Sequence, residues 1–247
     1  MGNFVRACRF CSWRILLWHI IFVHGKFLLG PLIFGSPNDG LNFVLQNLKS
    51  RGNLQMLKGI WEILSLDIGN IINDVGFQTF FEALLNQETH EYKDLQLLLT
   101  FSERFWDTMC TFHFPGIGEV MLTPYNFSVI TGLRLGGERI KVNDFLTPTE
   151  IKILFGIVPS KLKSKNVSLM WLYENIERYK IVATGTCMFM LLFIGTFSCP
   201  DLGSTVSLRY LWSLRDIDQI KNYDWGGMAY ATLLHFMTQL SGAVSQA

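Results

Sequence analysis

The uncharged stretch Ile181–Pro200 constrains the fold more than any other part of this chain. Its residues would be apolar on every side of a helix, a pattern found at the centre of globular domains and in membrane spans. Its length is borderline for a bilayer, and Gly185, Gly195 and three threonines lower its hydropathy. We therefore predict a buried core helix and keep a membrane span over residues 181–199 as the alternative.

The composition is that of a globular protein with few charges. The chain has 247 residues, of which 49% are apolar and 17% charged, and its formal net charge is +1. This length suits one large domain or two small ones, and the near-zero charge offers no electrostatic case for nucleic acid or an anionic membrane as a partner. An odd, scattered set of cysteines argues against a disulfide framework and fits a reducing compartment. They are Cys8, Cys11, Cys110, Cys187 and Cys199.

Residues 1–35 form an apolar N-terminal segment whose status the sequence leaves open. Three arginines precede an apolar run, as in a signal peptide, but no small-x-small cleavage site follows them. The segment is interpreted as a targeting segment, as a core helix, or as sequence that does not belong to the fold. A membrane-anchored protein would use the apolar residues 15–33 together with 181–199.

The remainder, residues 36–247, is interpreted as one helical domain that begins with the loop up to Gly40. Apolar residues recur at helical spacing in several segments. The first helices are predicted from Leu41 to Arg51 and at Leu54–Leu64, Phe77–Leu85 and Lys93–Asp107. Later ones are predicted at Ser168–Arg178, Val206–Trp212, Arg215–Lys221 and Trp225–Leu240, the last with Asp224 as its cap.

The stretch Thr111–Gly137 departs from this helical pattern. Apolar and polar residues alternate on both sides of a Pro-Gly turn, which predicts a β-hairpin over residues 111–123. Thr123 then caps a short helix that stops at Gly132, where a left-handed conformation is cheap only for glycine. His113 lies on the outer face of the hairpin, where it is interpreted as facing solvent or hydrogen-bonded and not as a catalytic residue. The predicted fold class is therefore mainly α, a single multi-helix domain with one small hairpin.

A second capping device, Thr147–Glu150, starts another helix that ends near Phe155. The loop after this helix is basic, and a solvated loop is favoured over a phosphate or nucleic-acid contact. Its lysines are Lys161, Lys163 and Lys165. Ion pairs are expected further on, between Asp216 or Asp218 and Arg209 or Arg215.

The sequence contains none of the motifs that carry well-known chemistry. Cys8 and Cys11, with His19 and His24 downstream, have a spacing too short for a zinc finger and are interpreted as ordinary thiols. The glycine-rich run Gly132–Gly137 follows a helix instead of a strand, so it does not fit a dinucleotide site. We assign no catalytic, cofactor-binding or metal-ligating residue, and no cofactor or small-molecule substrate.

Two blocks of residues nevertheless form an ordered pattern. The first contains Leu99–Trp106, Thr111–Phe114, Leu122–Thr123, Thr131–Leu133 and Gly136–Gly137. The second contains Cys199–Asp201, Val206–Leu211, Asp216–Asp218 and Tyr223–Gly226. Together they resemble the plant mobile domain, which is also labelled aminotransferase-like and is named after maintenance-of-meristems proteins. The resemblance runs from Gly76 to the C-terminus. Because domains of that family continue well past the Trp-Gly helix, we expect a truncated or transposon-associated copy.

The resemblance implies a mostly helical domain found in plant nuclear proteins and transposable elements. Family members are implicated in transposon silencing, genome stability and meristem maintenance, with a phosphatase-like protein as partner. A pyridoxal phosphate enzyme would need a Schiff-base lysine, a phosphate cup and an acidic partner for the pyridinium nitrogen, and none is recognisable here. We therefore expect a non-enzymatic nuclear interaction module. Chromatin association fits the family but has no support from charge. A membrane-anchored protein and a pyridoxal-phosphate-type enzyme are the alternatives.

Overall fold

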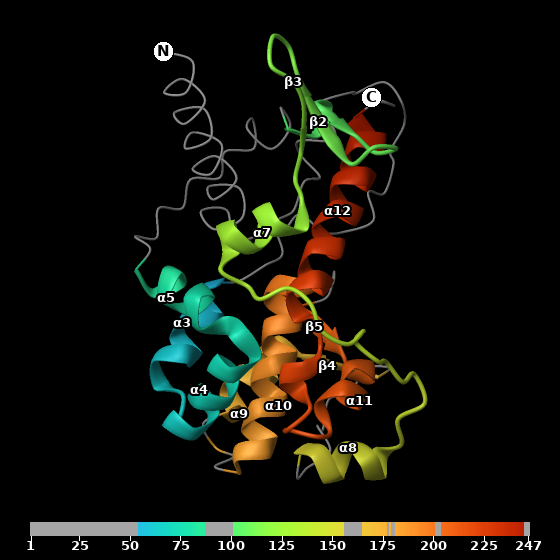
Figure 1. Ribbon diagram of the computed structural model, residues 1–247. Coiled ribbons are helices and arrows are strands. Elements are labelled where there is room, and N and C mark those ends of the chain that lie inside the picture. Colours follow the sequence, from blue (N-terminus) through green and yellow to red (C-terminus); the bar gives the residue numbers. More distant parts are fainter. Residues whose placement is uncertain are drawn as a thin grey trace.

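The computed structural model describes residues 54–86, 101–155, 165–176, 178, 181–200 and 204–244. The segment 1–35, the membrane candidate 15–33 and the predicted helix from Leu41 to Arg51 lie outside the described residues. In the described part, helices dominate and two small antiparallel sheets accompany them (Figure 1). The prediction of a mainly α fold is confirmed.

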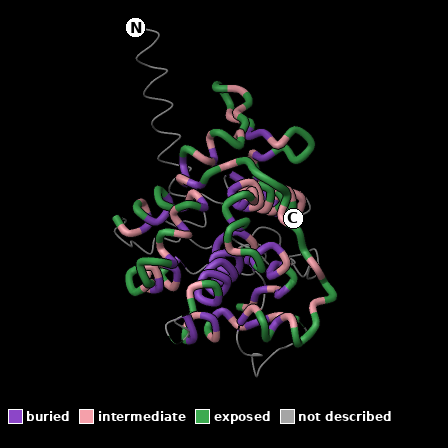
Figure 2. Tube along the Cα trace, turned by 60° about the horizontal axis from the view of Figure 1, so that its bottom comes forward, coloured by how far each residue is buried: buried purple, intermediate pink, exposed green. Residues whose placement is uncertain are grey.

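Helix α10 (Val182–Phe193) and the π-helical turn η4 (Ile194–Ser198) that continues it form the centre of the fold. Every residue from Thr184 to Ser198 is buried, so a helix that is apolar on all sides is also covered on all sides (Figure 2). The predicted core helix is confirmed. Among the described residues, no helix is both long and apolar enough to cross a membrane.

Helical segments from the N-terminal part of the described chain pack against this centre. They are α3 (Leu54–Ile63), α4 (Leu66–Ile72), the π-helical turn η3 (Asn73–Phe77) and α5 (Gln78–Leu85). Aromatic rings fill the contact: the centroids of Phe77 and Phe193 are 4.4 Å apart, and those of Trp61 and Phe189 are 5.8 Å apart. The predicted helices at Leu54–Leu64 and Phe77–Leu85 are confirmed, with one boundary of each moved by one residue.

A two-stranded antiparallel sheet lies beside η4 and consists of β4 (Asn166–Ser168) and β5 (Thr205–Ser207). Each strand passes directly into a helical segment: α9 (Leu169–Ile176) after β4, and η5 (Leu208–Tyr210) with α11 (Leu211–Leu214) after β5. The two strand-to-helix junctions are tied by reciprocal backbone hydrogen bonds. The N–H of Leu169 donates to the carbonyl of Ser204 at 3.0 Å, and the N–H of Leu208 donates to that of Lys165 at 2.9 Å.

This sheet corrects two predicted helix starts. Ser168 and Val206 were assigned to helices, but both lie in strands. The predicted helix Arg215–Lys221 is also wrong, since only the short 3₁₀ turn η6 (Ile220–Asn222) forms there. At Ser168 and Val206, pairing between distant strands replaces the helix, because it satisfies backbone N–H and carbonyl groups that the first turn of a helix would leave unpaired.

The second sheet is three-stranded and antiparallel, in the order β1 (Phe105–Trp106), β2 (Thr111–Phe114) and β3 (Gly118–Met121). It projects at one end of the molecule, beside the C-terminal end of α12 (Trp225–Val244) (Figure 1). The side chains of Phe105 and Phe112 are paired and buried, and the Ser241 hydroxyl donates to the Phe105 carbonyl at 2.8 Å. The predicted hairpin is confirmed, but the prediction that the helix from Lys93 runs to Asp107 is wrong, because Phe105 and Trp106 pair with β2.

Two shorter helices begin and end as the sequence predicts. For α7 (Pro124–Thr131), the Thr123 hydroxyl accepts from the Asn126 N–H at 3.1 Å, and Gly132 closes the helix with φ of 74°. For α8 (Pro148–Phe155), Glu150 accepts from the backbone N–H of Thr147 at 2.7 Å and completes the capping box.

Candidate functional site

The two blocks of family-like residues meet along one seam. The N–H of Glu138 donates to the Asn222 carbonyl at 2.6 Å, and the N–H of Asp224 donates to the Glu138 carbonyl at 2.9 Å. One carboxylate oxygen of Asp224 accepts from the N–H of Gly136 at 3.0 Å and from that of Gly227 at 2.8 Å. Asp224 therefore caps α12, as predicted, and fastens the glycine-rich run to it.

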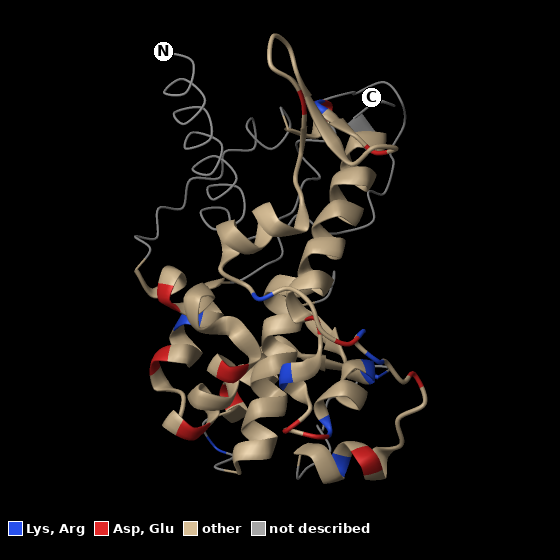
Figure 3. Cartoon of the chain, in the orientation of Figure 1, with Lys and Arg blue, Asp and Glu red and all other residues tan. Residues whose placement is uncertain are grey.

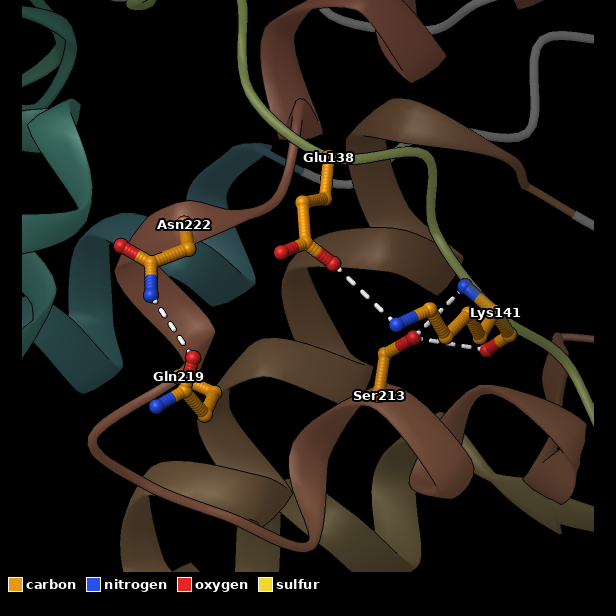
Figure 4. A network of polar contacts seen from close by, with 5 residues as sticks. All are labelled: Glu138, Lys141, Ser213, Gln219 and Asn222. Carbon is orange, nitrogen blue, oxygen red and sulfur yellow. Dashed lines mark hydrogen bonds and ion pairs between the residues drawn. The ribbon is translucent and has the colours of Figure 1, made fainter.

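Side chains extend the seam towards α11 (Figure 4). The backbone N–H of Lys141 donates to the Ser213 hydroxyl at 2.8 Å, and that hydroxyl donates to the Lys141 carbonyl at 2.7 Å. The Lys141 ammonium pairs with Glu138 at 3.1 Å, which raises the pKa of Lys141. Nearby, the Asn222 amide donates to Gln219 at 2.8 Å. These contacts hold the extended segment from Glu138 to Lys141 against η6 and α11, and they present no reactive group to solvent.

Two glycines allow the seam to close. A Cβ added at Gly226 would lie 2.2 Å from the Arg134 carbonyl oxygen, and one added at Gly137 would lie 2.4 Å from that of Asn222. Real Cβ atoms do not approach backbone oxygens this closely. The glycine-rich run Gly132–Gly137 is therefore part of a structural joint between this segment and α12.

The expected ion pairs of the later segment are not formed within the described ranges. The Arg215 guanidinium lies over the Trp212 ring, 3.9 Å from its centroid. The Asp216 carboxylate accepts from the backbone N–H of Asp218 at 3.2 Å, and Arg209 contacts its neighbouring tyrosine. Both arginines thus contact aromatic rings, while both aspartates lie in an exposed turn.

Burial keeps two ionisable side chains near the core, Tyr210 and Cys187, in their protonated forms. Tyr210 accepts from Arg209 at 3.3 Å and lies 3.6 Å from the Cys199 sulfur, and its pKa is raised, mainly by burial. Burial also raises the pKa of Cys187 to about 12, and its thiol donates to the Leu214 carbonyl at 3.1 Å. Neither group is poised as a nucleophile or a base at neutral pH.

Metal ligands do not gather in the part of the chain that the structure describes, where no three His, Cys, Asp or Glu side chains come together. Cys8, Cys11, His19 and His24 lie outside that part. Of the lysine loop, only Lys165 is described, and its ammonium donates to the Asp144 carbonyl.

The exposed side of the three-stranded sheet is the strongest candidate for a functional surface. We call it the outer sheet face and define it by the exposed residues Trp106, His113, Glu119 and Met121, which the strand register places on one side; Thr111, between Trp106 and Met121 on the same side, is buried. Trp106 is 53% exposed and Met121 49%. The Trp106 ring stacks on the His113 ring with 6.0 Å between centroids. His113 faces solvent, as predicted, whereas the sequence did not indicate Trp106 because a two-residue strand carries no periodicity.

Comparison with known proteins identifies the family. The profile of a family described as "Domain of unknown function (DUF8566)" matches residues 50–246. Protein MAIN-LIKE 1 of Arabidopsis thaliana is 30% identical over 188 residues, which are 70% of this chain and 35% of that protein. Protein MAINTENANCE OF MERISTEMS of the same plant is 29% identical over 150 residues, 56% of this chain and 31% of that protein. The chain belongs to the plant mobile domain family.

This plant mobile domain chain spans about a third of the length of those two relatives. A further relative, the serine/threonine-protein phosphatase 7 long form homolog of Arabidopsis thaliana, is 27% identical over 158 residues. That match covers 60% of this chain and 12% of that protein. No solved structure matches the plant mobile domain chain.

Proposed function

We propose that this plant mobile domain chain is a non-enzymatic protein-interaction module of the nucleus that binds a phosphatase-like partner on the outer sheet face. The observation that carries the proposal is the exposure of Trp106 and Met121 side by side with His113 on a projecting sheet. Tryptophan and methionine are enriched in protein interfaces, and tryptophan is among the residues that carry most binding energy there.

The sheet that carries these side chains is packed against the rest of the domain. Its opposite face packs on the domain through Phe105 and Phe112, and the C-terminal part of α12 is hydrogen-bonded to β1 through Ser241. A partner therefore meets anchors that are already ordered, which lowers the entropy lost on binding.

The choice of partner and cellular role rests on the family. A protein named as a phosphatase long form contains a segment similar to this chain over 12% of its length. A sequence of this kind and a phosphatase name thus occur in one protein, which supports a phosphatase-like partner. Roles in transposon silencing, genome stability and meristem maintenance are proposed on the same basis, together with nuclear localisation.

The proposal is tested by purifying the tagged full chain from plant nuclei and quantifying any phosphatase-like protein that accompanies it. Trp106→Ala should lower that recovery by about tenfold, because loss of one interface anchor costs about 1–2 kcal/mol. Phe145→Ala is the matched control, since Phe145 is an aromatic residue that is 85% exposed but does not belong to the sheet.

Absence of the tagged chain from nuclei would refute the localisation. Equal recovery with wild type and Trp106→Ala, while both proteins have the same melting temperature, would show that the outer sheet face is not the binding surface.

A further inference from the structure

Within the described residues, strand β3 is an edge of the three-stranded sheet, because the order is β1-β2-β3. The N–H of His113 donates to the Arg104 carbonyl on the β1 side at 2.8 Å. In an antiparallel sheet, successive residues direct their backbone groups to opposite sides, so Phe112 faces β3 and pairs with Val120. The backbone groups of Glu119 and Met121 must then point outward, away from β2.

Most of these outward groups have no partner in the described part of the chain. The Met121 carbonyl accepts from the Asn126 amide at 3.4 Å. The N–H and carbonyl of Glu119 and the N–H of Met121 make no hydrogen bond with described residues. Unpaired groups of this kind are a template for another strand. Edge strands are commonly blocked by proline or by charged side chains, lysine above all; β3 contains neither proline nor lysine, and its one charged residue is Glu119.

The side chains along this edge define what could pair with it. Glu119 and Met121 are both exposed and lie on the outer sheet face. Within the described residues, the Glu119 carboxylate forms no ion pair or hydrogen bond. Between Phe101 and Met121 the chain has three acidic side chains and one basic one, and the sheet is otherwise uncharged (Figure 3). The edge therefore complements a segment that carries a basic residue.

A second copy of this chain fits the edge poorly. Twofold pairing centred on Val120 would place Glu119 opposite Met121, and pairing centred on Glu119 would set two carboxylates against each other. Pairing centred on Met121 would require its carbonyl, which already accepts from Asn126.

We infer that an extended segment of a partner protein adds to β3 as a fourth, antiparallel strand, with an apolar residue opposite Met121 and a basic residue two positions later, opposite Glu119. This inference rests on the proposed interaction role and specifies how that partner is bound. The backbone supplies three hydrogen bonds. The apolar residue extends the row of Trp106, Thr111 and Met121 on the outer sheet face, and the basic residue pairs with Glu119.

The direct test uses the full chain and an end-blocked, fluorescein-labelled peptide, Ser-Thr-Val-Thr-Leu-Thr-Lys-Thr-Ser, followed by fluorescence anisotropy. Its leucine is meant to lie opposite Met121 and its lysine opposite Glu119. N-methylation of the lysine removes the N–H that faces Glu119 and should weaken binding by about tenfold. N-methylation of the threonine between leucine and lysine, whose N–H faces away, should change affinity by less than about twofold.

A charge exchange supplies an independent check that does not depend on stability. Glu119→Lys should weaken binding of the lysine peptide by about fivefold and should strengthen binding of the same peptide with glutamate in place of lysine. Equal effects of the two N-methylations, or no rescue by the charge exchange, would overturn strand addition at this edge.

The nuclear co-purification separates this inference from the proposed function. If Trp106→Ala abolishes partner recovery while Glu119→Lys leaves it unchanged, the proposed function stands and strand addition at β3 is refuted. If wild type recovers no phosphatase-like protein, the proposed function fails, whatever the peptide does. Self-association of the wild-type chain in sedimentation, lost in Glu119→Lys, would show that the edge binds a second copy and would overturn the inference.

Discussion

Replacing Gly226 by alanine should destabilise the protein through the seam alone. Gly226 lies in the first turn of α12, and its Cβ would be 2.2 Å from the Arg134 carbonyl oxygen and 3.2 Å from a methyl carbon of Leu135. The first of these neighbours is backbone, so it cannot turn away as a flexible side chain would. The helix and the segment around Arg134 must therefore separate by about 1 Å to restore an ordinary contact.

The expected cost follows from two opposing effects. Overpacking of this kind costs about 1–3 kcal/mol. Alanine in place of a helical glycine returns about 0.5–1 kcal/mol. The net loss should be about 0–2.5 kcal/mol, with a fall in melting temperature of up to about 10 °C for a domain of this size. Separation also lengthens the hydrogen bond from Gly136 to Asp224, so the loss belongs to the upper half of that range.

Urea unfolding followed by circular dichroism measures this loss as a lower midpoint with an unchanged slope. Gly242→Ala is the matched control, because Gly242 lies in the same helix and a Cβ there meets no atom within 4 Å. The control should be as stable as wild type or slightly more so. If Gly226→Ala matches Gly242→Ala, the close approach at the seam does not contribute to stability and the argument is wrong.

Three further predictions concern single residues. Gly132→Val should lower the melting temperature, because φ is 74° there and a Cβ would lie 2.9 Å from the Phe80 backbone nitrogen. His113→Ala should melt like wild type. If the two variants melt at the same temperature, the left-handed conformation at Gly132 does not constrain the fold. Cys187 should resist iodoacetamide at pH 8 until the chain is unfolded, as read by mass spectrometry, because its pKa in the folded protein is about 12. The contribution of this raised pKa to the free energy of unfolding is complete below pH about 9 and is lost as the pH rises further. The Thr147 N–H lowers the pKa of Glu150, so the ionised carboxylate stabilises the fold at neutral pH and this stabilisation is lost as pH falls through the pKa of the folded protein. In urea titrations at decreasing pH, Glu150→Gln should therefore lose less free energy of unfolding than wild type.

Features whose chemistry lies within a few residues were predictable from the sequence. The caps at Thr123, Gly132 and Asp224 follow from local hydrogen bonding and from the φ that glycine permits, and the structure confirms each of them. The central helix Val182–Phe193 was predictable because a segment that is apolar on all sides must be covered on all sides, and its length and its glycines and threonines favour a protein core over a bilayer.

Features that depend on distant partners were not predictable. The sequence predicts that Phe105 and Trp106 end a helix, yet their backbone pairs with β2, and strands of two residues are too short to show alternation. Val206 is predicted to be helical for the same reason, because its pairing with Val167 of the distant strand β4 leaves no local sequence pattern. The outer sheet face could not be found for this reason, since it exists only once β1 joins the hairpin.

The position of the central helix in the order of synthesis has a consequence for the cell. Its covering elements come from both sides of it in the chain: α3 and α4 precede it, while α11 and the 20-residue α12 follow. A ribosome therefore releases this uncharged helix before α11 and α12, which complete its cover, have been translated, and in that interval part of its apolar surface is exposed on the nascent chain. A chain that stopped before α12 would leave the part of η4 that α12 covers permanently exposed, and such a product would need shielding from aggregation.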